Sequence, residues 1–107
     1  LAWDALPWLD GAQHCLQEGV VSSIHSQNAK ASASVANFQQ VLERHPKLWP
    51  ILVDPQTGGG LLAGMPADQA TACVQALVAA GYPQACVVGN VLATRDESGV
   101  AAVTVLL

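Results

Sequence analysis

The most regular pattern of apolar and polar positions in this chain lies between Pro66 and Gly81. The apolar side chains there stand at i, i+3, i+4, i+7 and i+8, which is the spacing of one face of an α-helix. They are Ala70, Cys73, Val74, Leu77 and Val78. Pro66 and Asp68 commonly open a helix, and glycine at position 81 commonly ends one. The pattern therefore predicts a helix between these residues.

Two shorter helices are predicted nearer the start of the chain. Asp10 suits the N-cap of a helix through residues 12–16, and Gly19 suits its C-terminal stop. A weaker helical spacing covers residues 38–42. Pro46 should end that helix, because proline has no backbone N–H to continue the hydrogen bonding.

Short apolar runs bounded by turn residues predict β-strands. They are residues 1–9, which run into a turn at Pro7, residues 61–65, residues 85–91 and residues 100–107. The last two should pair as a hairpin across a turn at residues 96–99. Residues 20–37 are rich in Ser, Ala and Asn, and we expect either a loop or an irregular strand there. The whole pattern predicts one α+β domain whose strands pack on a layer of helices.

Composition adds an expectation about partners. Hydrophobic residues make up 51% of the 107 residues and charged residues 11%, against about 25% charged in an average soluble domain. This excludes a disordered chain and indicates apolar surface that something else covers. Four scattered basic residues and a net charge of −4 exclude nucleic acid as a partner. No apolar run approaches the roughly 18 residues of a membrane span, so no membrane partner is expected.

The cysteines and the chain ends indicate where the protein works and how much of it is present. Cys15, Cys73 and Cys86 are odd in number and form no Cys-x-x-Cys pair, which favours buried free thiols in a cytoplasmic protein. The chain has no initiator methionine and begins and ends within apolar segments. We therefore expect it to be a piece of a longer protein.

Residues 54–62, Asp-Pro-Gln-Thr-Gly-Gly-Gly-Leu-Leu, are the one segment whose composition indicates ligand chemistry, and we call them the glycine segment. Successive N–H groups of Gly58–Gly60 can form an anion-binding nest, with the Thr57 hydroxyl beside it. The alternative is purely structural, with Asp54 and Pro55 starting a tight turn and the glycines forming a bulge. Composition alone favours the structural alternative.

Two better-known phosphate motifs do not fit the glycine segment. A P-loop needs Lys followed by Ser or Thr after its last glycine, and Leu61 and Leu62 stand there instead. Residues 58–63 match the dinucleotide pattern G-x-G-x-x-A, but that pattern must open a helix, and Pro66 with an expected strand before it argues against one. The segment therefore predicts neither nucleotide site.

No catalytic or metal-binding set is predicted elsewhere. The three histidines, His14, His25 and His45, are scattered and lack partners at metal-ligand spacing. His14 and Cys15 are adjacent on a predicted helix and cannot face one another, so no nucleophilic pair is expected. The tryptophans, Trp3, Trp8 and Trp49, are expected in the core or in an interface.

The glycine segment resembles the Asp-Pro-Gln-Thr-Ser-Gly-Gly-Leu-Leu signature of the selenophosphate synthetases, with Gly58 in place of Ser. Other stretches resemble that family in the same order and spacing, so the resemblance runs over nearly the whole chain. They are Leu6–Ala12, Gly19–Val21, Met65–Ala67, Gly81–Tyr82 and Val88–Val91. The last of these stands where the family usually has Ile-Gly-Glu-Val.

The resemblance implies that residues 1–107 are a partial C-terminal domain. Such a domain is a layered α/β/α structure of the aminoimidazole ribonucleotide synthetase type, partly ferredoxin-like, and here it would lack its opening helix at the N-terminus. Enzymes of this family convert selenide, ATP and water to selenophosphate, AMP and phosphate. Their N-terminal domain dimerises, binds ATP and magnesium, and carries the reactive Cys or selenocysteine, a Lys and the metal-binding aspartates.

By the same resemblance, four residues form a loop that faces the active-site cleft, Thr57, Gly58, Gly59 and Gly60, and Asp54 shapes it. The expected role is a cleft wall, with no catalytic residue, bound cofactor or activity in this chain alone. The alternative is a non-catalytic binding or scaffolding module of a fusion protein with an oxidoreductase-like part. Without its opening helix the chain is also expected to self-associate.

Overall fold

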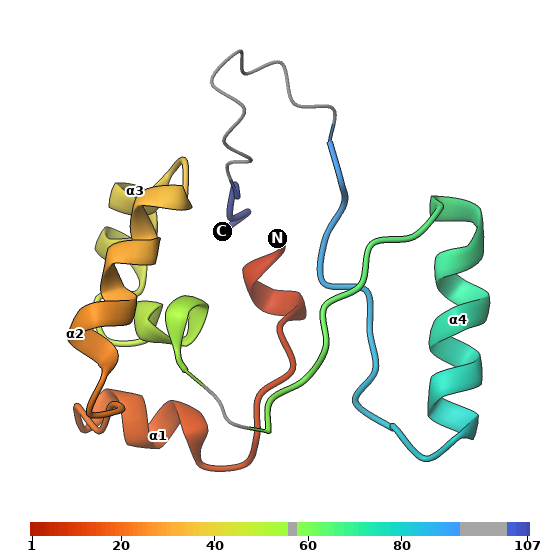
Figure 1. The fold of residues 1–107 in the computed structure, drawn as a ribbon, viewed down its shortest axis with the longest axis horizontal. Helices are drawn as coiled ribbons and strands as arrows, with labels where there is room; N and C mark the ends of the chain where they lie inside the picture. Colours follow the sequence, from red (N-terminus) through yellow and green to blue (C-terminus); the bar gives the residue numbers. More distant parts are fainter. Residues whose placement is uncertain (56–57, 93–102) are drawn as a thin grey trace.

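The computed structural model describes residues 1–55, 58–92 and 103–107. Most described elements gather in a body near the two chain ends, whereas the last helix lies apart from them (Figure 1). The α-helices of the body are α1 (Ala12–Gln17), α2 (His25–Asn28) and α3 (Phe38–Arg44), and its 3-10 helices are η1 (Trp3–Ala5), η2 (Ala29–Ser34) and η3 (Trp49–Val53). The separate helix is α4 (Ala67–Ala79).

Helix α4 confirms the clearest sequence prediction, including the way the helix ends. Gly81 adopts the left-handed conformation with φ of 98°, which costs a residue without Cβ little. Its N–H donates to the Val78 carbonyl at 3.1 Å, and the N–H of Tyr82 donates to the Leu77 carbonyl at 3.0 Å. This pair of bonds satisfies two carbonyls that the helix end would otherwise leave unpaired.

Helix α1 ends in the same way, at the predicted stop. Gly19 has φ of 78°, and the N–H of Val20 donates to the Cys15 carbonyl at 2.9 Å. The N-cap is Gly11 and not Asp10, so the prediction of an Asp10 cap is wrong by one residue. Helix α3 ends with His45 as its C-cap, immediately before Pro46, as expected.

The described residues form no β-strand, and their β-pairing is limited to two isolated parallel bridges. The layered α/β/α sheet is therefore not present in this part of the chain. The predicted strands at residues 61–65 and 85–91 are connections without strand structure, and η1 occupies much of residues 1–9. A strand needs a neighbour to satisfy its N–H and C=O groups, and an apolar run alone does not supply one.

Residues 20–37 also differ from expectation, because α2 and η2 occupy much of this segment in place of a loop or strand. The segment has few β-branched residues, and its small side chains are compatible with short helical turns. The predicted turn at residues 96–99 and the start of the last predicted strand, at residues 100–102, lie outside the described residues.

Residues 103–107 lie between two segments that are far away in sequence. On one side Val103 donates its N–H to the Ser34 carbonyl, and its own carbonyl accepts from the Ala36 N–H, each at 2.8 Å. On the other side Leu106 donates to Leu1 at 2.7 Å and accepts from Trp3 at 2.9 Å. The expected hairpin between residues 85–91 and 100–107 is wrong for the described residues, since residues 1–3 take that place. The N–H of Ala2 also donates to the Val88 carbonyl at 2.8 Å.

The core of the body is small and forms where these segments meet. Its buried residues are Trp3, Val41 and Val105. Partly buried apolar side chains pack around them: Leu6, Trp8, Val35, Leu48, Trp49, Ile51 and Leu52. The expectation that the tryptophans fill the core is confirmed. The expectation of buried cysteines is wrong, because Cys15 and Cys86 are exposed and Cys73 is half-buried, although all three are free thiols.

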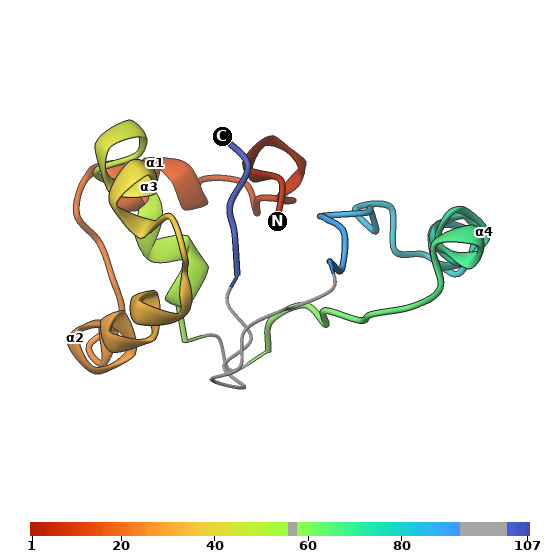
Figure 2. The same ribbon diagram turned by 90° about the horizontal axis from the view of Figure 1, so that it is seen from above.

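Helix α4 lies away from the body at the end of two extended segments, residues 58–66 and 82–92, in both views of the ribbon (Figures 1 and 2). We call residues 58–92 the arm. No residue of α4 is buried, so its apolar stripe has no core to join in this structure. Among the described residues, no helix is long and apolar enough to cross a membrane.

Candidate functional site

The glycine segment leaves the body at a fixed point, the end of η3. Pro50 of this 3-10 helix is buried, and the side-chain amide of Asn28 donates to the Val53 carbonyl at 3.3 Å. Asp54 follows as the C-cap, half-buried and in an extended conformation with φ of −65° and ψ of 125°. The body therefore positions Asp54, the first residue of the glycine segment.

The glycines of the segment are exposed, and they lie where the arm begins (Figure 1). A Cβ atom added to Gly58 or Gly60 would meet no other atom within 4 Å. Crowding inside this chain therefore does not require glycine at these two positions. The open space is what a backbone would need if a ligand or another part of a protein approached it closely.

The nest of Gly58–Gly60 stays a prediction, because residues 56–57 immediately before it lie outside the described residues. Positive φ angles among the described glycines occur at Gly11, Gly19 and Gly81, which are helix-terminal positions. An anion-binding nest of successive N–H groups alternates right- and left-handed residues or uses a turn. Thr57 lies outside the described residues, so the contribution of its hydroxyl stays a prediction.

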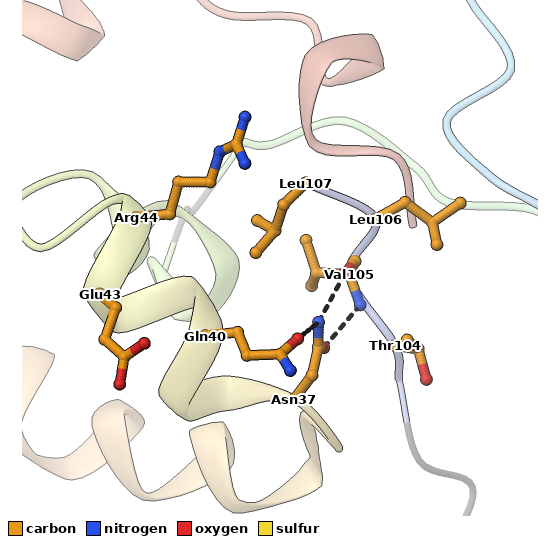
Figure 3. A pocket seen from close by; sticks show the side chains of 8 residues that line it. All are labelled: Asn37, Gln40, Glu43, Arg44, Thr104, Val105, Leu106 and Leu107. Atoms are coloured by element: carbon orange, nitrogen blue, oxygen red, sulfur yellow. Dashed lines mark hydrogen bonds between the residues drawn. The ribbon is translucent and has the colours of Figure 1, made fainter.

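A hollow that sequence reasoning missed lies beside α3 (Figure 3). It has a volume of about 700 Å³ and is open to solvent. Its lining comes from α3 and the residue before it, and from the last four residues of the chain: Asn37, Gln40, Glu43, Arg44, Thr104, Val105, Leu106 and Leu107. It therefore depends on contacts between distant segments, and no local pattern in the sequence indicates it.

Asn37 holds the two sides of this hollow together. Its side-chain amide donates to the Val105 carbonyl at 2.7 Å, and its side-chain oxygen accepts from the Val105 N–H at 2.9 Å (Figure 3). The amide also lies 3.4 Å from the side-chain oxygen of Gln40. Asn37 thus gives Val105 the two hydrogen bonds that a neighbouring strand would otherwise provide.

The hollow has few groups that could do chemistry. Arg44 and Glu43 are exposed side chains at its edge, and neither is held in an ion pair with the other residues that line it. In residues 1–55, 58–92 and 103–107, no three His, Cys, Asp or Glu side chains lie together as a metal site would require. What the structure shows for it is a structural role, since Asn37 joins the start of α3 to the last residues of the chain.

His45 is the one described group with a clearly shifted pKa. Burial against the core lowers the pKa of its imidazole from 6.5, the neighbouring charge of Arg44 lowers it further, and the carboxylate of Asp4 acts in the opposite direction. The imidazole stacks on Trp3, so it is a packing residue of the body. It is neither near the other two histidines in sequence nor part of the glycine segment.

Comparison with known proteins bears on the family resemblance. Selenide, water dikinase 2 of Peptoclostridium acidaminophilum is 30% identical over 93 residues, which are 87% of this chain and 26% of that protein. Selenide, water dikinase of Rhizobium meliloti (strain 1021) is 31% identical over 93 residues, with the same two shares. That of Bdellovibrio bacteriovorus is 32% identical over 101 residues, 92% of this chain and 27% of that protein.

The chain spans about a quarter of the length of these curated relatives. No protein-family model and no solved structure matches it. The match nevertheless covers most of the chain in three relatives that share one printed activity, which agrees with the signature in residues 54–62. Over nearly its whole length, this chain is therefore a relative of the selenide, water dikinases, the selenophosphate synthetases.

Proposed function

We propose that residues 1–107 are part of the C-terminal domain of a selenide, water dikinase-type protein, and that the glycine segment lines its reaction cleft. The observation that carries this proposal is that the glycines of the family signature have no neighbouring atoms in this chain that would require glycine. Residues 54–62 match eight of the nine signature positions, counted against the family sequence given above. Around Gly58 and Gly60 there is nothing within 4 Å to explain glycine on packing grounds.

The chemical contribution of such a segment is binding and electrostatic positioning. Phosphoryl transfer depends on orienting the reacting groups and stabilising charge on phosphate oxygens, and backbone N–H groups can supply both. The Thr57 hydroxyl would add one donor. Gly58 lacks the hydroxyl of the family's Ser, but its backbone N–H remains, because a nest needs no side chain.

The described residues do not fit a site for ATP or magnesium by themselves. No cluster of three potential metal ligands is present among them. Of the basic residues described, Lys47 donates to the Gln17 carbonyl at 3.0 Å, and Arg44 is an exposed residue at the end of α3. In the proposed intact enzyme, ATP and Mg²⁺ are held by an N-terminal domain that also makes the homodimer, and this chain contributes no step through them.

One residue favours a second candidate function. Gly58 stands where the signature has Ser. Such a substitution is expected in a loop that no longer binds phosphate, because the Ser hydroxyl is then not needed. The candidate is a non-catalytic binding or scaffolding module joined to an oxidoreductase-like part. The amino acids that precede Leu1 distinguish the two functions, because a Cys or selenocysteine near a Lys, together with several aspartates, is needed for the dikinase reaction.

The free thiols of Cys15, Cys73 and Cys86 agree with a reducing compartment, and we assign the protein to the cytoplasm on that ground.

The experiment that tests the proposed function uses the intact protein. We expect it to release AMP from ATP in a reaction that depends on selenide. Substitution of Gly59 by Val should reduce this release without unfolding the protein. Absence of selenide-dependent AMP formation by the intact protein, with residues 54–62 unchanged, would refute the proposal and leave the binding module.

A further inference from the structure

The 3-10 helix η3 is held at both of its ends by helical elements from elsewhere in the body. At its start, the ring of Trp49 contacts the rings of His25 in α2 and Phe38 in α3, with centroids 5.3 and 5.1 Å away. At its other end, the side-chain amide of Asn28 donates to the Val53 carbonyl at 3.3 Å. Both α2 and η2 also pack on η3. The helix that precedes the glycine segment therefore has a defined position.

The bond from Asn28 lies at the last carbonyl before the glycine segment begins. Val53 is the last residue of η3, and Asp54 is both its C-cap and the first residue of the segment. A helix leaves its last carbonyl groups without partners inside the helix, and the side-chain amide of Asn28 supplies one. The carbonyl of Val53 and the N–H of Asp54 belong to one planar peptide unit, so a bond to the first also restricts the second.

Local structure does not account for asparagine at position 28. Asn28 is the last residue of α2 and stands before η2, and among the described residues its side chain makes no cap hydrogen bond to η2. Asparagine is a poor helix former, because its side chain commonly bonds to the backbone nearby. Here the side chain bonds instead to a carbonyl 25 positions away. The contact with η3 is therefore what accounts for this residue type.

We propose that Asn28 is a positioning residue for the glycine segment, because its amide fixes the end of η3 and thereby the point from which residues 54–62 enter the reaction cleft. This inference rests on the function proposed above. In this role Asn28 acts through the peptide unit between Val53 and Asp54 and not by contact with the reacting groups. Misplacing a group in an active site by about 1 Å can lower a rate about 100-fold, so the anchor of such a segment affects catalysis from a distance.

The test replaces Asn28 by Ala in the intact protein and measures the steady-state kinetics of selenide-dependent AMP formation. We expect kcat to fall at least about tenfold and the KM for ATP to change less than about twofold, because the proposed N-terminal domain holds ATP. Asn28→Gln keeps an amide donor on a longer side chain, and its kcat should lie within about threefold of that of the unchanged protein.

Asn37→Ala is the matched control, because it also removes a side-chain amide that donates to a distant backbone carbonyl, that of Val105 at 2.7 Å. Its bond holds the last residues of the chain and not η3. This variant should lower the urea midpoint at least as much as Asn28→Ala does, since Asn37 makes two bonds to Val105. Its kcat per folded protein should nevertheless stay within about twofold of that of the unchanged protein. A merely structural role for Asn28 would give two variants that lose stability and keep kcat.

Hydrogen exchange of the intact protein locates the effect. Amides of η3 should exchange at least about fivefold faster in Asn28→Ala than in the unchanged protein, while those of α1 keep their rates. Unchanged exchange in η3, unchanged kcat of folded Asn28→Ala, an equal fall of kcat in Asn37→Ala, or Asn28→Gln no more active than Asn28→Ala would each overturn this inference alone. Absence of selenide-dependent AMP formation by the unchanged protein would overturn it together with the proposed function, so the two failures are distinguishable.

Discussion

The imidazole of His45 lies flat on the indole of Trp3, with ring centroids 4.0 Å apart and ring planes 8° from parallel. Trp3 belongs to η1 near the start of the chain, and His45 caps the end of α3. The stack therefore joins two elements that are 42 positions apart in the sequence (45 − 3). Burial is the main cause that lowers the pKa of His45, and the charge of Arg44 lowers it further.

This stack should make the stability of the body depend on pH. The unfolded chain has the ordinary histidine pKa of 6.5, and the folded pKa lies below it, so between these values the unfolded chain binds more protons. The contribution of His45 is full above pH 6.5 and is lost as the pH falls through the folded pKa. Urea unfolding of residues 1–107 at pH 7.5 and pH 5 should show the loss, and His45→Gln should reduce the difference. An unchanged pH dependence in that variant would contradict the assignment.

Asn37→Ala should destabilise the body by about 2–3 kcal/mol, because it leaves both the N–H and the carbonyl of Val105 without their partner. The free energy of unfolding, measured in urea, checks this value. Gln39→Ala is the matched control, since Gln39 bonds only to the side chain of Glu43 at 3.1 Å on the exposed face of the same helix. A cost for Asn37→Ala no larger than that of the control would show that Val105 is held by other contacts.

Val41→Ala should cost about 2 kcal/mol of unfolding free energy, because it removes two methyl groups from a fully buried position and leaves a cavity. Thermal or urea unfolding measures the effect. Val20→Ala makes the same chemical change at an exposed position and should cost less than about 0.5 kcal/mol. Equal effects at the two positions would mean that the small core contributes little to stability.

Gly60→Val separates a functional role of the glycine segment from a structural one. A Cβ at this position would meet nothing within 4 Å, so the stability of residues 1–107 should change by less than about 0.5 kcal/mol. In the intact protein, selenide-dependent AMP formation should fall by at least about tenfold, because the side chain blocks close approach of the backbone. Thr57→Ala should cost less, about 1–2 kcal/mol in the transition state. Full activity of a folded Gly60→Val protein would show that the glycine segment has only the structural role of a turn.

Residues 1–107 alone should not bind ATP at micromolar concentrations, since the described residues provide no metal cluster and the chain has only four basic residues and a net charge of −4. Titration calorimetry with ATP and Mg²⁺ tests this. The intact protein is the positive control, and micromolar binding by the 107 residues alone would show that a nucleotide site lies within them.

The sequence by itself determined the features that depend on neighbours along the chain. Gly19 and Gly81 end α1 and α4, and Pro46 follows the end of α3, because these residue types act on the backbone where they stand. The family relationship also follows from the sequence, since a nine-residue signature in residues 54–62 needs no tertiary contact to be read.

Only the tertiary structure decided which extended segments pair. Residues 61–65 and 100–107 have similar apolar patterns, yet the end of the second is enclosed by distant segments and the first is exposed and unpaired. Nothing in the sequence around Asn37 predicts that its side-chain amide bonds to the backbone of Val105, 68 positions away. Pairing depends on where the rest of the chain brings a free N–H and C=O, and a local pattern of apolar residues does not contain that information.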